Sequence, residues 1–422
     1  MKKQSFLPKL IAAAALAAAP AVLLITPNVV AQQESVLYSF NPTLKQGVNP
    51  QSNLIFDAAG NLYGTTYSGG VNSCFDLPDY CGTVFELSPN GDGGWTEKTL
   101  HNFGQGNDGS SPTAGVIFDK VGNLYGTTSM GGAYGYGTVF ELSPTKAGGW
   151  SEKVLHHFAY NGTDGIYPYA GLVLDAEGNI YGTTGNGGTF DAGTVFELSP
   201  AGDGTWAETI LHSFVENGRE GVSPWSSLIA DSSGNFYSTT AGGGVYGFGT
   251  VFEISKTAAG SWSLTTLYNF NYNGQDAVQP YTGLAFDQQG NLYGATTGGG
   301  VYGYGALYEL SPASDGSWTE RILHSFANNS KDGKQPTAGV TLDEFGNVYG
   351  TTPYGGAYAE GTVYELAASD WTETVLYSFQ GLHGDQPEGT VTLDATGNIY
   401  GTTNFGGPYG KFGFGTVFEI RP

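Results

Sequence analysis

One position of the sequence, repeated at intervals of 56 residues, carries three large aromatic side chains in succession, and an acid stands five residues before each. The aromatic residues are Tyr169, Trp225 and Tyr281, and the acids are Asp164, Glu220 and Asp276. Aromatic rings stack on the apolar faces of sugars, while carboxylates accept hydrogen bonds from hydroxyl groups. We therefore expect a ligand-binding site with the rings as its floor, the acids as its rim and Arg219 as an anion contact. The alternative is that these aromatic residues only pack the loops of a glycine-rich surface.

The same three carboxylates also offer chemistry for an enzyme. Glycoside hydrolysis needs two carboxyl groups within roughly 5–10 Å of one another, which act as acid and base. The sequence shows no other catalytic signature, since it lacks His-Glu-x-x-His, Gly-x-Ser-x-Gly and a phosphate loop that ends in Gly-Lys-Ser or Gly-Lys-Thr. Glycine-rich stretches such as residues 131–137 join two expected strands and open no helix, which excludes a dinucleotide fingerprint.

Other acids and histidines recur too regularly to mark a single active site. One glutamate position returns in every copy of the repeat, and four of the six histidines share one position with three tyrosines. The recurring residues are Glu86, Glu141, Glu197, Glu253, Glu309, Glu365 and Glu419; His101, His156, His212 and His324; and Tyr38, Tyr268 and Tyr377. Because an active site is needed only once, we expect these groups to form hydrogen-bonded networks within the repeats rather than catalytic or metal sites.

A repeat of about 56 residues must position all of these side chains. Its most regular phrase reads Asp-Ala-Ala-Gly-Asn-Leu-Tyr-Gly-Thr-Thr in residues 57–66. The aspartates that start the phrase stand 62, 56, 56, 56, 56 and 51 residues apart: Asp57, Asp119, Asp175, Asp231, Asp287, Asp343 and Asp394. Self-similarity at this period indicates an array of one supersecondary unit.

Each copy divides into four expected strands, a to d, which in the second copy cover residues 112–119, 123–128, 137–142 and 150–158. The a–b link, Asp-x-x-Gly-Asn, supplies a side chain that caps the turn and a glycine for a positive φ. The 68 glycines and 51 tyrosines and phenylalanines suit short strands joined by tight loops. The predicted fold is all-β, a seven-bladed β-propeller of four-stranded antiparallel blades.

The ends of the chain predict how the ring closes. Residues 35–40 match only strand d, whereas residues 415–420 form a strand c that no strand d follows. The N-terminal strand can therefore complete the last blade, which argues against an open solenoid with two ends to cap. In such blades the d–a and b–c loops emerge on one face, where the candidate site residues gather.

Three phrases of the repeat carry a resemblance to a known family: Gly-Asn-Leu-Tyr-Gly-Thr-Thr, Gly-Gly-x-Tyr-Gly-x-Gly and Thr-Val-Phe-Glu-Leu. They resemble the GloVer tandem repeat of exported bacterial proteins, including proteins of the choice-of-anchor type. The resemblance covers essentially the whole chain after residue 31. It implies export and a propeller-like repeat, and it implies no particular activity.

The N-terminal residues have the features of a secretory signal peptide. Lys2 and Lys3 precede an apolar stretch over residues 10–25, and small residues up to Ala31 suit cleavage after it. We expect residues 1–31 to be removed and residues 32–422 to form one propeller domain, which is secreted or lies at the cell surface or in the periplasm. A membrane anchor is the alternative interpretation, but the stretch is short and Pro20 interrupts it.

The chain is strongly acidic. Three of its 15 basic residues lie in the predicted signal, so the remaining 12 basic and 38 acidic side chains give a formal charge of −26. Such a surface repels nucleic acid and anionic lipid, so we expect neither as a partner and no membrane insertion after cleavage. We expect a monomer without a cofactor, whose partner is a glycan or a cell-surface ligand.

Both cysteines, Cys74 and Cys81, lie in an insert of the first repeat. In an exported protein their pairing favours a local disulfide that pins an extra loop. Two cysteines without clustered histidines are a poor ligand set for zinc, so the disulfide is favoured over a metal site there, and no residue of the chain is assigned as a metal ligand.

Three functions remain open on this basis. The leading hypothesis is a non-catalytic binding protein that recognises a glycan or a surface partner through the aromatic and acidic face of the d–a and b–c loops. One alternative is a hydrolase or lyase that acts on polysaccharide with carboxylates of that face, and another is a purely structural surface or adhesion protein. The fold itself does not choose among them, because propellers host many functions.

Overall fold

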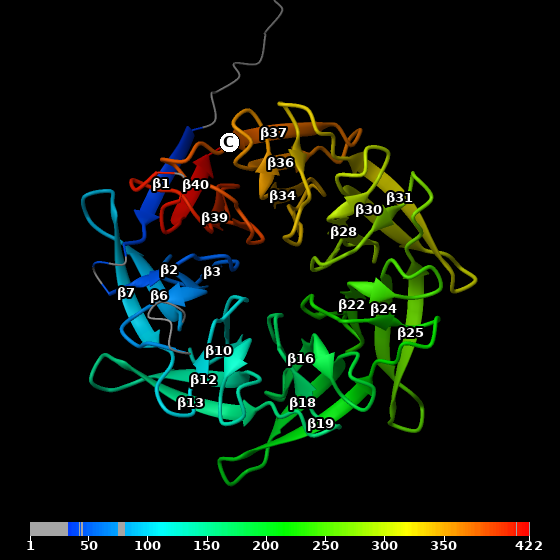
Figure 1. Cartoon of the computed structure of the whole chain (residues 1–422), viewed down its shortest axis with the longest axis horizontal. Helices are drawn as coiled ribbons and strands as arrows, with labels where there is room; N and C mark the ends of the chain where they lie inside the picture. Colours follow the sequence, from blue (N-terminus) through cyan, green and yellow to red (C-terminus); the bar gives the residue numbers. More distant parts are fainter. Residues whose placement is uncertain (1–32, 42, 44, 75–80, 411, 422) are drawn as a thin grey trace, which may run out of the picture. The chain divides into compact units, whose positions relative to one another are not determined.

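The computed structural model describes residues 33–41, 43, 45–74, 81–410 and 412–421. They form seven four-stranded antiparallel sheets arranged as a ring, which confirms the predicted all-β propeller (Figure 1). The predicted signal peptide, residues 1–31, lies outside the described residues. Within the described ranges no helix is long and apolar enough to cross a membrane.

The four strands of each blade follow one another in the order a, b, c and d from the channel outward (Figure 1). Blades 1 to 4 are β3 (Ile55–Phe56), β4 (Leu62–Thr66), β6 (Thr83–Pro89) and β7 (Trp95–Asn102); β9 (Ile117–Phe118), β10 (Leu124–Thr128), β12 (Thr138–Pro144) and β13 (Trp150–His157); β15 (Val173–Leu174), β16 (Ile180–Thr184), β18 (Thr194–Pro200) and β19 (Trp206–Ser213); and β21 (Ile229–Ala230), β22 (Phe236–Thr240), β24 (Thr250–Lys256) and β25 (Trp262–Asn269). Blades 5 to 7 are β27 (Ala285–Phe286), β28 (Leu292–Thr296), β30 (Ala306–Pro312) and β31 (Trp318–Ser325); β33 (Thr341–Leu342), β34 (Val348–Thr352), β36 (Thr362–Leu366) and β37 (Glu373–Ser378); and β38 (Thr392–Leu393), β39 (Ile399–Thr403), β40 (Thr416–Arg421) and β1 (Gln33–Ser39).

Small two-stranded sheets tie the d–a loops to the b–c loops. They pair β2 (Gly47–Val48) with β5 (Ser68–Gly69), β8 (Gly109–Ser110) with β11 (Met130–Gly131), β14 (Gly165–Ile166) with β17 (Asn186–Gly187), β20 (Gly221–Val222) with β23 (Gly242–Gly243), β26 (Ala277–Val278) with β29 (Gly298–Gly299), and β32 (Gly333–Lys334) with β35 (Tyr354–Gly355). In the last blade a single antiparallel bridge between Asp385 and Phe405 takes their place. The two kinds of loop therefore lie on one face of the ring, as the sequence predicts.

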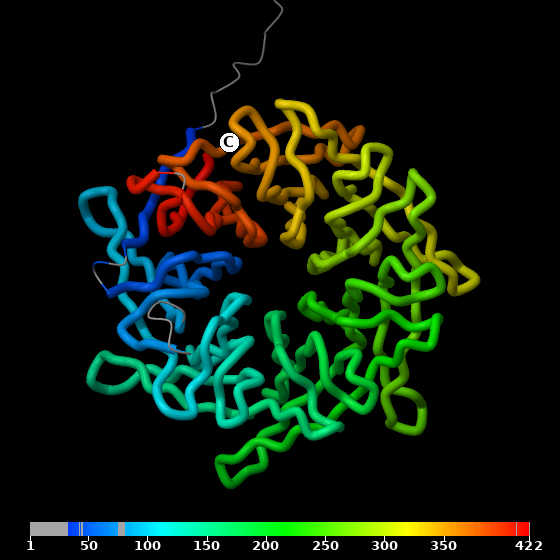
Figure 2. The backbone as a smooth tube through the Cα atoms, in the orientation of Figure 1, coloured from blue at the N-terminus to red at the C-terminus, as the bar shows by residue number. Residues whose placement is uncertain are grey.

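The N-terminal strand closes the ring. β1 pairs antiparallel with β40, from Gln33 opposite Arg421 to Ser39 opposite Thr416. The blue start of the described chain accordingly lies beside its red end in the backbone trace (Figure 2). The predicted completion of the last blade by the N-terminal strand is confirmed, and it leaves no unpaired end in the ring.

The a–b turn is built around its aspartate. In blade 2 one carboxylate oxygen of Asp119 accepts hydrogen bonds from the backbone N–H groups of Val121 and Asn123, at 2.9 and 2.8 Å. The other oxygen accepts from the side chains of Asn123 and Tyr125. Gly122 has a φ of 93° in this turn. The expected capping side chain and positive-φ glycine are both present.

Strand a is shorter than the sequence predicts. Only two residues of each expected strand, such as Ile117–Phe118 in blade 2, pair with strand b. The channel-side half is held differently, because threonine side chains of one blade donate to backbone carbonyls of the next. Thr65 donates to the carbonyl of Ala114 at 2.8 Å, and Thr127 donates to that of Ala170 at 2.9 Å. These contacts between blades replace ladder bonds within the blade.

Aromatic residues lock neighbouring blades together. The phenylalanine that follows each strand d is fully buried and lies edge-on against the aromatic residue of strand c in the next blade. Ring centroids are 5.0 Å apart for Phe103 and Phe140, and 5.2 Å apart for Phe40 and Phe85 across the closure. The closing blade thus uses the same contact as the others.

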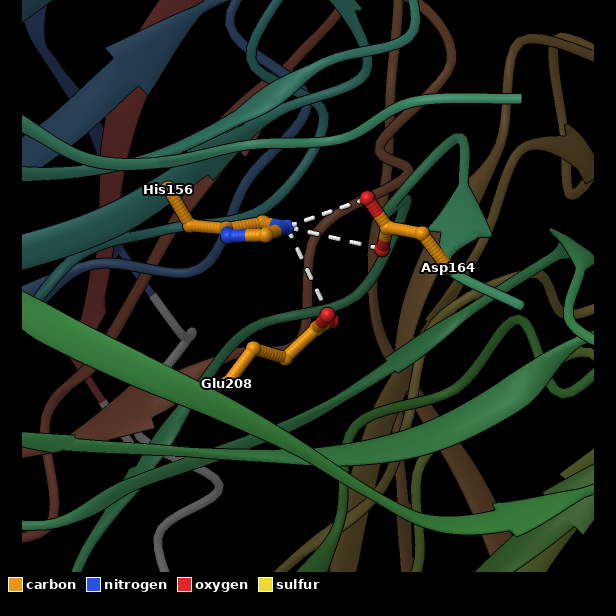
Figure 3. A group of neighbouring side chains, drawn as sticks. All are labelled: His156, Asp164 and Glu208. Atoms are coloured by element: carbon orange, nitrogen blue, oxygen red, sulfur yellow. Dashed lines mark hydrogen bonds and ion pairs between the residues drawn. The ribbon is translucent and has the colours of Figure 1, made fainter. Parts of the chain in front are cut away.

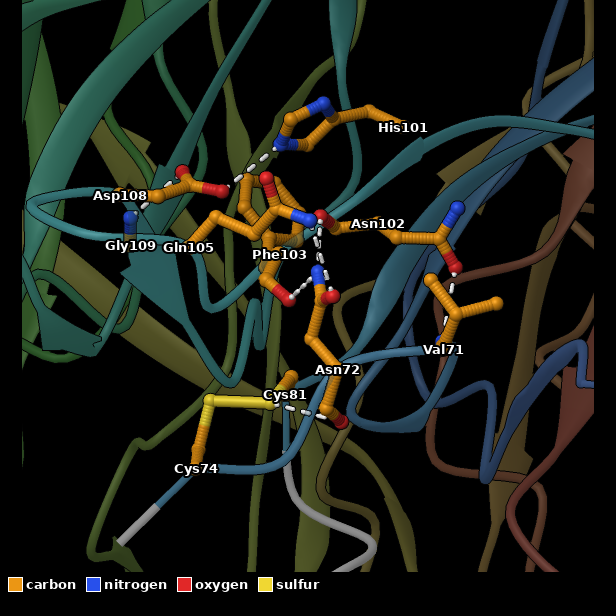
Figure 4. The surroundings of a disulfide bond; sticks show 10 residues. All are labelled: Val71, Asn72, Cys74, Cys81, His101, Asn102, Phe103, Gln105, Asp108 and Gly109. Carbon is orange, nitrogen blue, oxygen red and sulfur yellow. Dashed lines mark hydrogen bonds and ion pairs between the residues drawn. A yellow bond between two sulfur atoms is a disulfide. The ribbon is translucent and has the colours of Figure 1, made fainter.

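Cys74 and Cys81 form the predicted disulfide, with Cα atoms 5.5 Å apart (Figure 4). Residues 75–80 between them lie outside the described residues. Asn72, beside the bridge, donates from its side-chain amide to the carbonyls of Asn102 and Phe103. The bridge therefore holds the insert against the end of strand d in blade 1.

If closure is as strong as the other junctions, Phe40→Ala and Phe103→Ala should cost the ring similar free energy. Both side chains are at most 1% exposed, and truncation of a buried phenylalanine typically costs about 3–5 kcal/mol. Denaturant unfolding of both variants measures this. A nearly neutral Phe40→Ala beside a damaging Phe103→Ala would show that the closing strand contributes little.

Candidate functional site

One mouth of the channel is lined by one residue from each blade. The residue after the strand-a proline supplies them, in blade order Gln51, Thr113, Tyr169, Trp225, Tyr281, Thr337 and Glu388. They enclose a cavity of about 570 Å³. Below it the wall consists of small residues such as Ala170, Gly171 and Ser226, so the cavity continues into the channel.

The three predicted aromatic residues lie side by side at this mouth. The ring centroids of Tyr169 and Trp225 are 5.7 Å apart with their planes nearly perpendicular, at 63°. Those of Trp225 and Tyr281 are 5.2 Å apart with planes only 31° from parallel. Trp225 is 40% exposed, while the two tyrosines are half-buried. The structure therefore brings together the aromatic half of the predicted site.

A missing side chain makes room for this tryptophan. A Cβ on Gly185 would stand 2.7 Å from the Nε1 atom of Trp225 and 3.1 Å from a ring carbon of Tyr169. The equivalent residue of every other blade has a side chain, for example Ser129 in blade 2 and Ala241 in blade 4. Blade 3 is thus shaped to hold the indole at the mouth.

A polar arc faces the aromatic arc across the channel. Blades 7 and 1, which stand opposite blade 4 in the ring, contribute Glu388 and Gln51 (Figure 1). Burial raises the pKa of the Glu388 carboxyl to about 7, although the 3.1 Å hydrogen bond that it accepts from Asn404 acts in the opposite direction. The mouth is therefore amphipathic, with rings on one side and a titratable carboxyl on the other.

The predicted acidic rim does not lie at this mouth. None of Asp164, Glu220 and Asp276 is among the described residues that line the cavity. Each turns instead to a side chain of the strand d that precedes its loop: Asp164 lies 3.3 Å from Nε2 of His156, Glu220 lies 2.9 Å from Nε2 of His212, and Asp276 accepts from the Tyr268 hydroxyl at 3.3 Å. Arg219 is exposed, and its backbone N–H donates to Asn217.

These acids belong to polar clusters between neighbouring blades. At the junction of blades 2 and 3, His156 of β13, Asp164 of the following loop and Glu208 of β19 point toward one another (Figure 3). The glutamate comes from a Trp-x-Glu pattern at the start of strand d, which gives Glu97, Glu152, Glu208, Glu320 and Glu373. The expected histidine network is therefore present, but it joins two blades rather than staying within one.

The recurring glutamates of strand c have local partners. Glu86, Glu141, Glu197 and Glu309 each accept a hydrogen bond from the serine two residues later, at 2.9–3.0 Å. Glu419 accepts from the Tyr400 hydroxyl at 2.8 Å. These contacts lie within single blades and agree with a structural role for this position.

The sequence analysis assigned no role to two features of the site. Glu388 occupies the same repeated position as Trp225. It is the only charged residue among the seven copies of that position, and this difference could have marked it as a candidate site residue. Glu208 and its equivalents could have been found from the Trp-x-Glu pattern, but their partners lie in the preceding blade, about 45–50 residues away in the chain. A comparison of the repeats shows which residues recur, but it does not show which residues of neighbouring blades are in contact.

The fold and the ring of seven residues at the channel mouth define a closed tandem-repeat β-propeller to which each blade contributes one mouth side chain. The chain belongs to the Gloeobacter/Verrucomicrobia repeat family, whose model matches residues 23–173, 147–341 and 227–422. The resemblance in the repeat phrases is thereby confirmed. No curated protein matches the sequence.

Solved structures share the fold at low sequence identity. The extracellular domain of a proposed one-component system of B. thetaiotaomicron is similar with a TM-score of 0.54 and 11% identity, over 92% of this chain and 40% of that one. This chain thus spans about 40% of the length of that protein. The periplasmic gluconolactonase of Pseudomonas aeruginosa has a TM-score of 0.49 and 13% identity, over 85% of this chain and 99% of its own. At 11% identity the likeness to the extracellular domain shows a shared fold and nothing further.

The junction of blades 1 and 2 predicts a pH dependence of stability. Burial, and then the Asp108 carboxylate, raise the pKa of Glu152 from 4.5 to about 7, while His101 lowers it. A raised pKa in the folded state means that the proton bound by Glu152 stabilises the ring fully below about pH 4.5. This contribution is lost as the pH rises through about 7.

Glu152→Gln should therefore flatten the fall in melting temperature across this pH range, by roughly 1–2 °C once solvent screening is allowed for. Thermal unfolding at a series of pH values measures the difference. Glu177→Gln, a change at an exposed turn residue, is the control and should follow the unmodified protein. Parallel curves for Glu152→Gln and the unmodified protein would rule out this carboxyl as the source.

Proposed function

We propose that this protein is a non-catalytic binding propeller that holds a sugar-like polyol, most simply the end of a glycan chain, in the channel mouth. The observation that carries the proposal is the cavity in which three aromatic rings face Glu388 and Gln51. A polyol has apolar C–H faces and hydroxyl edges, and this cavity offers a partner for each.

The size of the cavity supports the same class of ligand. A volume of about 570 Å³ falls within the range of roughly 300–1,000 Å³ that is usual for small-molecule pockets. The nearly parallel pair of Trp225 and Tyr281 offers a broad stacking surface, and Tyr169 stands across its edge. Glu388 and Gln51 supply hydrogen-bond acceptors on the facing side.

A two-carboxylate hydrolase has less support. Among the described residues that line the cavity, Glu388 is the only carboxylate, whereas glycoside hydrolysis needs a pair. Asp164, Glu220 and Asp276, the residues predicted for that role, are engaged with strand d side chains at the junctions. The signal-like N-terminus and the export implied by the family resemblance support a secreted, cell-surface or periplasmic location.

Trp225→Ala should weaken binding of any oligosaccharide found on a glycan array by about 5- to 150-fold. Loss of a stacking surface of this kind is worth about 1–3 kcal/mol, and each 1.4 kcal/mol is tenfold in affinity. Tyr246→Ala, at an exposed tyrosine in a b–c loop of the same blade, is the matched control and should bind normally. Equal affinities for both variants would remove Trp225 from the site. Release of reducing sugar by the unmodified protein would contradict a non-catalytic role.

Affinity should also rise with pH through about 7. Loss of its proton makes Glu388 a charged acceptor at both oxygens and so a stronger partner for hydroxyl groups, and burial places that loss near neutrality. Titrations of the same oligosaccharide at several pH values test this expectation, and Glu388→Gln should bind with little pH dependence. A pH profile that is unchanged in Glu388→Gln would assign the titration to another group.

A further inference from the structure

The junctions between blades contain two clusters that carry the atoms of a metal site. They are His156, Asp164 and Glu208 between blades 2 and 3, and His324, Asp332 and Glu373 between blades 5 and 6. In each cluster one ligand atom from every residue lies within 4.8 Å of the others. We propose that each of these two junctions binds a first-row transition-metal ion such as Zn²⁺, which joins one blade to the next.

The distances around His156 are close to those that separate two ligands of one small ion. Nε2 of His156 lies 3.3 Å from Oδ2 of Asp164 and 3.7 Å from Oε1 of Glu208 (Figure 3). Two ligands bound to zinc at 2.0–2.1 Å with tetrahedral angles lie about 3.3–3.4 Å apart. An imidazole with two carboxylates is a ligand set that suits zinc, whereas Ca²⁺ takes six to eight oxygens.

Buried oxygen atoms without partners point to a missing ligand. Asp332 is only 7% exposed, and its Oδ1 atom has no hydrogen-bond partner among the described residues. Oε1 of Glu373 in the same cluster and Oε1 of Glu208 in the other are also buried and have no hydrogen-bond partner among the described residues, although the latter lies 3.7 Å from Nε2 of His156. An unsatisfied buried carboxylate oxygen is costly, and a bound cation would satisfy it.

The carboxylates are also oriented by the backbone. Oδ2 of Asp164 accepts from the N–H of Ala159 at 2.8 Å, and Oδ2 of Asp332 accepts from the N–H of Ala327 at 2.7 Å. Such outer contacts fix the direction of a metal-binding carboxylate before the ion arrives. The His156 side chain is 20% exposed, which leaves one side of the cluster open to solvent for entry and for a water ligand.

Two other junctions of the same ring lack one component, and a third, where His101, Asp108 and Glu152 meet, is not among the clusters whose ligand atoms all lie within 4.8 Å of one another. Between blades 4 and 5 the histidine is replaced by Tyr268, whose hydroxyl lies 3.3 Å from Asp276 and 3.2 Å from Glu320. Between blades 3 and 4, His212 and Glu220 are present, but Leu264 stands where Glu208 stands one blade earlier. The chain therefore contains its own comparison sites, one without the nitrogen and one without the second carboxylate.

Calorimetric titration of the metal-free protein with zinc chloride tests the proposal. We expect two equivalents for the unmodified protein, one for His156→Tyr or His324→Tyr alone, and none for the double variant. Tyrosine is the replacement because it occupies this strand position in three native blades. Calcium chloride should give no saturable binding.

The matched control is His212→Tyr, which should retain two equivalents because its junction lacks the third ligand. Zinc should raise the melting temperature of the unmodified protein and of this control, and should not raise that of the double variant. If the double tyrosine variant does not fold, Glu208→Gln with Glu373→Gln serves the same comparison with the same expected loss.

Absence of saturable zinc binding by the unmodified protein would overturn the proposal, and so would two equivalents that persist in the double variant. Leu264→Glu tests whether a third zinc site can be created, since it supplies the missing carboxylate beside His212 and Glu220. A third equivalent in that variant would support the junction geometry as the source of binding.

Discussion

The edge-to-face contact between the phenylalanine that follows one strand d and the strand c aromatic of the next blade holds the ring together. It recurs at every junction with ring centroids 5.0–5.3 Å apart, including the junction that the N-terminal strand completes. Since both rings are fully buried, each blade can cover its apolar face only against a neighbour. Seven blades packed in this way must close into a ring, and Phe40, which follows the closing strand, makes the same contact with Phe85.

The sequence was sufficient for the fold because its repeat has a nearly fixed length and a strongly marked turn. Asp119 and its equivalents set the a–b hairpin locally, so four strands per repeat could be predicted without any long-range information. Strand a was predicted too long because its inner half depends on threonines of the preceding blade, such as Thr65 against Ala114. That dependence joins residues 49 positions apart in the chain and has no local signature.

The regular repeat also made the aromatic half of the candidate site predictable, but the prediction of its acidic half was wrong. Aligning the repeats places Tyr169, Trp225 and Tyr281 at neighbouring points of one circle, and the structure brings their rings together there. The alignment assigns a blade to each acid but not the direction of its side chain. Asp164 precedes Tyr169 by five residues, yet the small sheet of β14 and β17 lies between them and turns the carboxylate outward to His156. Proximity in sequence was a poor guide across that turn.

The residues that repeat in every blade and the residues that differ between blades lie in different parts of the ring. The junction aromatics and turn aspartates recur because every blade needs them, whereas the seven side chains at the channel mouth differ almost freely. Each mouth residue is supplied by a different repeat of nearly constant length. An exchange of one repeat for another would therefore change one of the seven mouth side chains together with the residues that the same repeat places at its two junctions, such as Gly185 beside Trp225.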